Sequence, residues 1–424
     1  MATSGNPFWY HLLFGRWFSV FASILIMSVS GATYMFGLYS SHIKSSLAYD
    51  QTTLNLLSFF KDLGANIGVI SGLVNEVAPA WVVLLIGVVM NLFGYTMIWL
   101  AVTNRIPNPQ IWHMCLYICI GANSQTFANT AALITCVKNF PESRGSILGL
   151  FKGFVGLSGA ILSQLFHAFY GNNSKSLIFL IAWLPSAVSV ILHRFVRIIK
   201  DLRQPNELKV FYHVLYISLG LAGSLMVCII LQNRLRFQQI HYVGSAIVVI
   251  VLLLLPLAIV FREELRIWRS KIKNPIPQLE LASQLPPPPP PNPPSDSCFK
   301  NMFNPPNRGE DYTIPQAIFS IDMIILFIAT ICGVERQMEA AGRLRKEGED
   351  LSCLGVECYK KAFLIITGST VLGGLVSLIL VVRTWKFYKD DIYRRFKEKE
   401  GEDIEIKIAA PTNNSLTAAK TVSA

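Results

Sequence analysis

The sequence predicts an all-α fold, a polytopic transmembrane helical bundle with about ten spans. Hydrophobic residues make up 52% of the 424-residue chain and charged residues only 15%, whereas about a quarter of the residues in a soluble domain are charged. Apolar runs of about 20 residues, the length that crosses roughly 30 Å of hydrocarbon, recur along the chain. The predicted spans are 17–39, 58–76, 81–102, 112–137, 147–169, 177–196, 211–231, 243–261, 315–334 and 362–382.

The lysines and arginines separate by side of the predicted membrane. With the amino end in the cytoplasm, 24 of the 37 lie in inner segments, 11 in outer segments, and Lys61 and Lys152 inside spans. Excess basic charge on the cytoplasmic side is typical of multi-pass membrane proteins. We therefore expect both chain ends in the cytoplasm. The membrane itself is either the plasma membrane or an endomembrane. The net charge of +11 is then explained by the orientation of the chain in a lipid bilayer, and we predict no nucleic-acid partner.

Changes in composition divide the chain into five parts. Residues 1–197 form an amino-terminal six-helix bundle, and 198–261 contain a basic joint and two further spans. A cytoplasmic Pro-rich linker follows at 262–314, whose PPPPPPNPP run is typical of a solvated spacer. The last two parts are a carboxyl-terminal helical part at 315–382, with an outer loop at 335–361, and a basic cytoplasmic tail at 383–424.

Several ionisable residues fall within the predicted spans. A charge at the bilayer centre costs roughly 2.5–3.5 kcal/mol, so such groups face protein or water. Lys61 and Asp62 are adjacent and project about 100° apart, so we expect them to be poor partners. Lys152 either reaches back to the inner surface or faces a cavity, where Asp62 or Glu76 is a candidate partner.

A stripe of small and polar residues follows one face of the fourth predicted span. It either hydrogen-bonds to neighbouring helices or lines a wet cavity, because lipid does not accommodate it. The stripe consists of Ala122, Gln125, Asn129, Ala132 and Cys136. Together with the embedded charges it gives the candidate substrate-binding residues, which are Asp62, Gln125, Asn129 and Lys152.

Glycines recur in three predicted spans: the second, the fifth and the last, which contains Gly368, Gly373 and Gly374. Small residues let helix backbones approach closely in lipid, so we expect tight helix packing there, and tightly packed helices that rock make good gates. The candidate gating and packing residues are Gly64, Gly68, Gly72, Arg144, Gly145, Gly149 and Gly153.

The sequence carries no motif for chemistry. It has no phosphate-binding loop, no zinc spacing and no nucleophile paired with a base, so we predict no enzyme activity, no metal and no cofactor. Most of the eight cysteines fall within spans, where thiols pack as small apolar groups. Cys353 and Cys358 share the outer loop, where a local disulfide is one interpretation.

The stretch FPESRGSILG at 140–149 resembles the loop between the fourth and fifth helices of the major facilitator superfamily, with Arg144 and Gly145 at matching places. Asn75 stands where that superfamily has an aspartate. RWFSVFASILIMSVSGATYMFGLYSS and NFPESRGSILGLFKG resemble the plant nodulin-like transporters of the nuclear-fusion-defective type, and the resemblance extends over nearly all of residues 10–260. It implies a major-facilitator-like bundle that moves a small-molecule or ion solute by alternating access.

The resemblance is interrupted after ICGV at 331–334. The chain then continues with a segment similar to the family's loop before its final helix, so about four spans are absent. Two functions follow as alternatives. One is a secondary-transporter-like membrane protein. The other is a shortened, non-transporting form, from splicing or an incomplete gene model, that acts through association with full-length family members.

Overall fold

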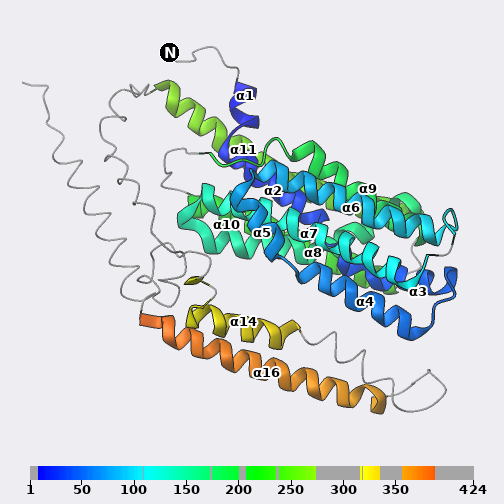
Figure 1. Ribbon diagram of the computed structural model, residues 1–424. Coiled ribbons are helices and arrows are strands. Elements are labelled where there is room, and N and C mark those ends of the chain that lie inside the picture. The colour runs from blue at the N-terminus through cyan, green and yellow to red at the C-terminus, as the bar shows by residue number, and fades with distance from the viewer. Residues whose placement is uncertain are drawn as a thin grey trace, which may run out of the picture. The chain divides into compact units, whose positions relative to one another are not determined.

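The computed structural model describes residues 8–107, 109–171, 174–199, 207–234, 238–273, 316–317, 319–334 and 356–386. The regular elements within these ranges are helices, which confirms the predicted all-α class (Figure 1). The chain divides into two compact units, Met1–Pro286 and Pro287–Ala424, which are described separately. The polyproline run, Cys353 and the tail beyond residue 386 lie outside the described residues.

Most of the helices belong to the first unit. Its α-helices are α1 (Phe8–Leu13), α2 (Arg16–Val29), α3 (Phe36–Ser46), α4 (Gln51–Asn66), α5 (Val69–Val77), α6 (Ala80–Val102), α7 (Ile111–Asn139), α8 (Arg144–Tyr170), α9 (Ser174–Leu192), α10 (Glu207–Arg234) and α11 (Gln239–Lys273). Two short 3-10 helices, η1 (Ala32–Met35) and η2 (Pro141–Ser143), lie between them.

The first two membrane-spanning segments are interrupted helices. Helices α2, η1 and α3 form one candidate span of 31 residues, and α4 and α5 form a second of 27 residues. The second begins earlier than expected because Asp50 caps α4, accepting a hydrogen bond from the Thr53 N–H at 2.8 Å. Hydrogen bonds from the Thr53 hydroxyl and N–H hold the pKa of Asp50 below its ordinary value.

Helices α7 and α8 organise the core of this unit. Helix α7 packs against α6, α4 and α2, whereas α8 packs against α2, α10 and α11. The largest core cluster joins Trp17, Phe140, Phe151 and Phe211. Helices α10 and α11, which lie in the range 198–261 expected as a separate part, pack against α8, and α11 continues past residue 261 into the range expected as a linker.

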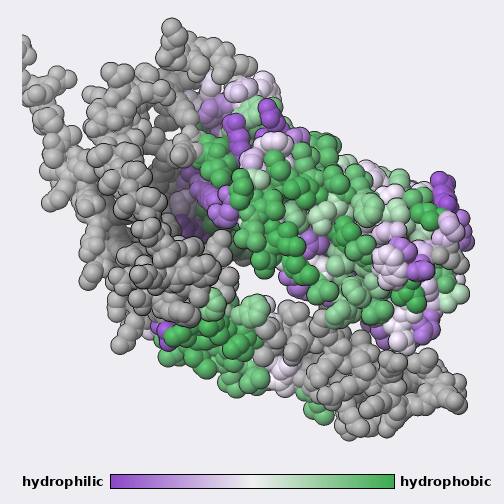
Figure 2. All heavy atoms as spheres, in the orientation of Figure 1, coloured by the Kyte–Doolittle hydropathy of each residue, from purple (hydrophilic) through white to green (hydrophobic). Residues whose placement is uncertain are grey.

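The described residues contain eight helices long and apolar enough to cross a membrane. Apolar side chains cover the visible flank of the bundle, and hydrophilic residues gather toward its ends (Figure 2). Many hydrophobic side chains of the first unit are exposed, among them Val69, Val77 and Val89 at 71%, 91% and 66%. Such a surface is stable in a bilayer, and the chain is a multi-pass membrane protein.

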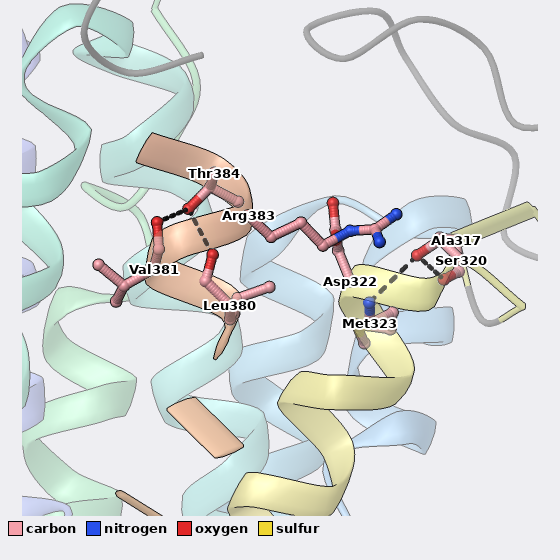
Figure 3. A network of polar contacts seen from close by, with 8 residues as sticks. All are labelled: Ala317, Ser320, Asp322, Met323, Leu380, Val381, Arg383 and Thr384. Carbon is pink, nitrogen blue, oxygen red and sulfur yellow. Dashed lines mark hydrogen bonds and ion pairs between the residues drawn. The ribbon is translucent and has the colours of Figure 1, made fainter. Parts of the chain in front are cut away.

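The described part of the second unit contains two paired helices, α14 (Ile321–Val334) and α16 (Val356–Lys386). Asp322, in the first turn of α14, accepts a hydrogen bond from Arg383 Nε at 2.7 Å, close to the end of α16 (Figure 3). The start of one helix thus meets the end of the other, so the pair is antiparallel. Because α16 begins at Val356, the end of the predicted outer loop is helical.

The glycines expected to pack helices divide into two groups. A Cβ built on Gly64 lies 2.3 Å from the carbonyl oxygen of Cys119, so only glycine permits this α4–α7 contact. Gly68, Gly72, Gly145, Gly149 and Gly153 do not make the expected close contacts, because a Cβ there meets nothing within 4 Å. Their faces of α5 and α8 are open among the described residues. The contact between Gly94 and Gly121, where a Cβ on Gly94 lies 2.6 Å from the Gly121 Cα, was not predicted.

We predict that Gly64→Ala destabilises the protein by about 1–3 kcal/mol, because the methyl group forces α4 away from α7. Gly72→Ala is the matched control: its methyl enters open space and favours the helix by about 0.5–1 kcal/mol. Thermal unfolding of the purified variants measures both effects. Equal melting temperatures for the two variants would contradict the proposed contact.

Candidate functional site

Lys61 and Asp62 form an ion pair, so the expectation that they are poor partners is wrong. Lys61 Nζ lies 2.9 Å from Asp62 Oδ1, and the two side chains are 9% and 16% exposed. The Cβ directions differ, but the four-carbon lysine side chain curves along the helix to reach its neighbour. The ammonium also lies 5.1 Å from the ring centre of Phe36 on α3. Lys61 is thus buried against protein.

The polar stripe on α7 is largely a helix contact. Ala122, Ala132 and Cys136 are fully buried, and Cys136 Sγ lies 3.3 Å from Ser23 Oγ on α2. Gln125 is 8% exposed and accepts a hydrogen bond from Thr33 Oγ1 at 3.1 Å. The stripe was expected either to contact neighbouring helices or to line a wet cavity. Gln125 and Cys136 contact α2 and the η1 segment, so helix contact describes them. Asn129 differs, because its buried Oδ1 has no hydrogen-bond donor among the described residues.

Lys152 lies on an open face of α8. Its side chain is exposed, as are Gly149, Gly153 and Gly156 on the same side of the helix. A Cβ added to any of these glycines would meet nothing within 4 Å. Arg144, the first residue of α8, is exposed as well. Lys61 and Lys152 thus have opposite surroundings, one enclosed by protein and the other uncovered.

The four candidate residues do not line one enclosed pocket. Gln125 borders a small cavity of about 20 Å³ between α2, α6, α7 and α9, whereas Asp62, Asn129 and Lys152 are not among its lining residues. A larger groove of about 800 Å³ lies between α4 and α7. Its lining is mainly apolar and includes Leu56, Phe60, Trp112 and Leu116. The described residues contain no cluster of His, Cys, Asp and Glu that could hold a metal ion.

Asn91 is a buried polar residue that the sequence analysis did not single out. Its side-chain amide, on α6, donates to the carbonyl oxygens of Ile181 and Ala182 and to Ser186 Oγ on α9, at 2.9–3.0 Å. Its Oδ1 lies 3.2 Å from Ser124 Oγ on α7. The sequence signal for this site, which the sequence analysis did not use, is a lone asparagine in an apolar helix together with Pro185 inside another helix.

A second set of buried charges joins the start of α2 to α10 and α11. Arg16 Nη2 lies 2.8 Å from Glu207 Oε1, and both side chains are about 95% buried. Glu264, which is 1% exposed, accepts a hydrogen bond from the Trp17 N–H at 3.0 Å. Its other oxygen lies 3.4 Å from His11 Nδ1. We call Arg16, Glu207, His11 and Glu264 the terminal charge cluster.

The loop after α9 is fixed to the same region. Asn139 Nδ2 donates to the Arg197 carbonyl at 3.0 Å, and Asn139 Oδ1 accepts from the Ile199 N–H at 2.8 Å. Arg197 in turn donates to the Phe14 carbonyl at 3.0 Å. These bonds connect segments more than 50 residues apart. This end of the bundle is therefore cross-linked by charge and hydrogen bonds, whereas the face around Lys152 is open.

An all-α bundle with several apolar spans, interrupted helices and buried intramembrane charges defines the class as a polytopic membrane protein. The family model described as Nodulin-like matches residues 16–261, more than half of the chain, and the chain belongs to that family. It is 35% identical over 182 residues to Protein NUCLEAR FUSION DEFECTIVE 4 of Arabidopsis thaliana. This match covers 42% of the chain and 31% of the relative, about a third of the relative's length. No solved structure matches the chain.

We predict that Glu264→Gln lowers the free energy of unfolding by about 1–3 kcal/mol, because a buried charge-assisted contact with His11 is lost. Glu263→Gln is the matched control. Glu263 pairs with Arg266 on its own helix, 3.0 Å away, and that arginine is 57% exposed. The Glu263 side chain is 12% exposed, and a pair with one exposed partner contributes at most about 1 kcal/mol. Thermal unfolding would contradict the cluster's role if the two variants melted at the same temperature.

Proposed function

We propose that this membrane protein binds a small anionic solute at the open face of α8 and carries it across the bilayer by alternating access. The observation that carries the proposal is Lys152, an exposed ammonium within an apolar helix, on a face lined by Gly149, Gly153 and Gly156. An intramembrane charge is stable only against protein or water, so its open surroundings favour a hydrated path. The glycines leave room for a solute to approach the backbone.

Features of the neighbouring helices support the same proposal. The α2–η1–α3 span is interrupted at residues 30–35, and Gln125 bonds to Thr33 within that interruption. Discontinuous helices near the bilayer midplane are typical of transporter binding sites. The buried Asn129 Oδ1 has no donor among the described residues, so it can accept a hydrogen bond from water along the proposed path, whereas the anion itself is attracted by Lys152. Asp62 has a different proposed role, because its pairing with Lys61 makes it a charge partner of that lysine.

Membership of the nodulin-like family is consistent with this proposed function. The second candidate is a non-transporting form that associates with full-length family members. One observation favours it: the resemblance of the sequence to the family is interrupted after Val334. In that form the open face of α8 would be covered by a partner's helices.

Uptake into proteoliposomes separates the two candidates. The purified chain is reconstituted and tested with a panel of anions, beginning with nitrate and citrate. We expect uptake of at least one anion. Lys152→Met should lower it about tenfold or more, because a contact with a charged group contributes roughly 1.5–3 kcal/mol.

Lys138→Met serves as the control, since Lys138 is an exposed lysine at the end of α7. Its uptake should equal that of the unmodified chain. A folded chain that moves no anion of a broad panel, or equal uptake by the two lysine variants, would contradict the proposed transport role of Lys152.

A further inference from the structure

We propose that the groove between α4 and α7 binds a sterol, a rigid and apolar ring system that carries one hydroxyl group. The groove measures about 800 Å³. Ligand sites occupy roughly 300–1,000 Å³ and have a mainly apolar lining with a few polar groups. The groove meets both criteria. None of its lining residues lies on α8, so it is separate from the face proposed for the transported anion.

The groove opens toward the surroundings of the bundle. Large apolar side chains that are at least 42% exposed line it: Leu56, Ile111, Trp112 and Leu116. Helix α4 is part of a candidate membrane span. Exposed apolar side chains within a span meet lipid, so the molecule that enters the groove comes from the bilayer.

The groove is shorter than a membrane span. Its lining on α7 runs from Ile111 to Cys119, eight residues further on, which is about 12 Å at 1.5 Å per residue. The hydrocarbon core is roughly 30 Å thick, so this length lies within one leaflet. A transmembrane helix of another chain crosses both leaflets, whereas a sterol occupies only one. The length therefore favours a lipid over a partner helix.

The charge of the lining favours a neutral ligand. The described residues that line the groove include no lysine, arginine, aspartate or glutamate, so the phosphate of a phospholipid has no charged partner there. The amide in the lining belongs to Gln110, at the start of α7. Gln110 Oε1 accepts a hydrogen bond from Trp112 Nε1 at 2.6 Å, so the amide nitrogen is the group that donates to a ligand's hydroxyl oxygen. One neutral polar group at the end of an apolar groove is complementary to a sterol.

The aromatic lining favours a rigid ligand over a flexible acyl chain. Phe60 and Trp112 provide flat rings with a large contact area. The Trp112 ring is held in place, because it stacks on His113 with 3.6 Å between the ring centres. An acyl chain loses the freedom of many rotatable bonds on binding, whereas fused rings are already fixed. For an equal contact area, the sterol therefore binds more tightly.

Photoaffinity labelling with a diazirine analogue of cholesterol tests the proposal. The full chain is reconstituted in phosphatidylcholine nanodiscs that contain the probe, irradiated, and mapped by peptide mass spectrometry. We expect labelling at 56–60 and 111–119 that saturates as the mole fraction of the probe rises. Excess unlabelled cholesterol should remove this labelling, whereas excess oleic acid should not.

Leu116→Trp should lower the labelling at least about fivefold, because the indole takes up space that the ligand needs. Leu92→Trp is the matched control: Leu92 on α6 is 40% exposed, against 45% for Leu116, and it does not line the groove. Labelling of this variant should equal that of the unmodified chain. Leu56→Trp, on the opposite wall and 42% exposed, gives the same test if Leu116→Trp does not fold.

Four results would overturn the proposal. Labelling that rises without saturation would assign the groove to bulk lipid, and equal competition by oleic acid would assign it to an acyl chain. Labelling that disappears when each nanodisc holds two chains would assign it to a second copy. Equal labelling of the groove variants and Leu92→Trp would place the sterol elsewhere. None of these measurements requires transport, so they stand apart from the uptake experiment.

Discussion

The structure depends on one constraint: a polar group within a membrane helix needs a partner from another helix or from water. Hydrocarbon offers no hydrogen bonds, so every embedded amide, hydroxyl or charge selects its neighbours. Gln125 meets Thr33, Asn91 meets the carbonyls of α9, and Asp322 meets Arg383. These contacts join segments that the apolar residues alone would pack without specificity. Polar residues therefore determine which helices adjoin and in which register.

The sequence predicts the fold class well because membrane spans are recognisable from their length and apolar composition. It predicts the contacts less well. The Lys61–Asp62 pair was missed because backbone directions were considered and lysine flexibility was not. The spacing of the glycines indicated close helix packing. The structure shows that Gly64 lies against the Cys119 carbonyl, whereas Gly72 faces open space. Glycine permits both situations, so its spacing alone does not decide between them.

The enclosed terminal charge cluster and the open face around Lys152 have different consequences for function. The terminal charge cluster is enclosed: Glu264 holds the first turn of α2, and Arg16 meets Glu207 between buried neighbours. Its partners are 190 or more residues apart in sequence, so no local pattern reveals it. The face of Lys152 is uncovered, and its open glycines make it the place where a solute or another helix can approach. A firmly joined end and an open face are consistent with the proposed transport by alternating access.

The most direct measurement of the central claim is the reactivity of a cysteine at position 152. The variant Lys152→Cys is made on a background in which the native cysteines are replaced, reconstituted in lipid, and exposed on both sides to a hydrophilic thiol reagent. The account predicts rapid labelling there and protection of Val89→Cys, because the Val89 side chain is 66% exposed in the middle of apolar α6 and we expect it to face lipid. Equal protection of both positions in a folded protein would contradict it, because the Lys152 side chain would then face acyl chains.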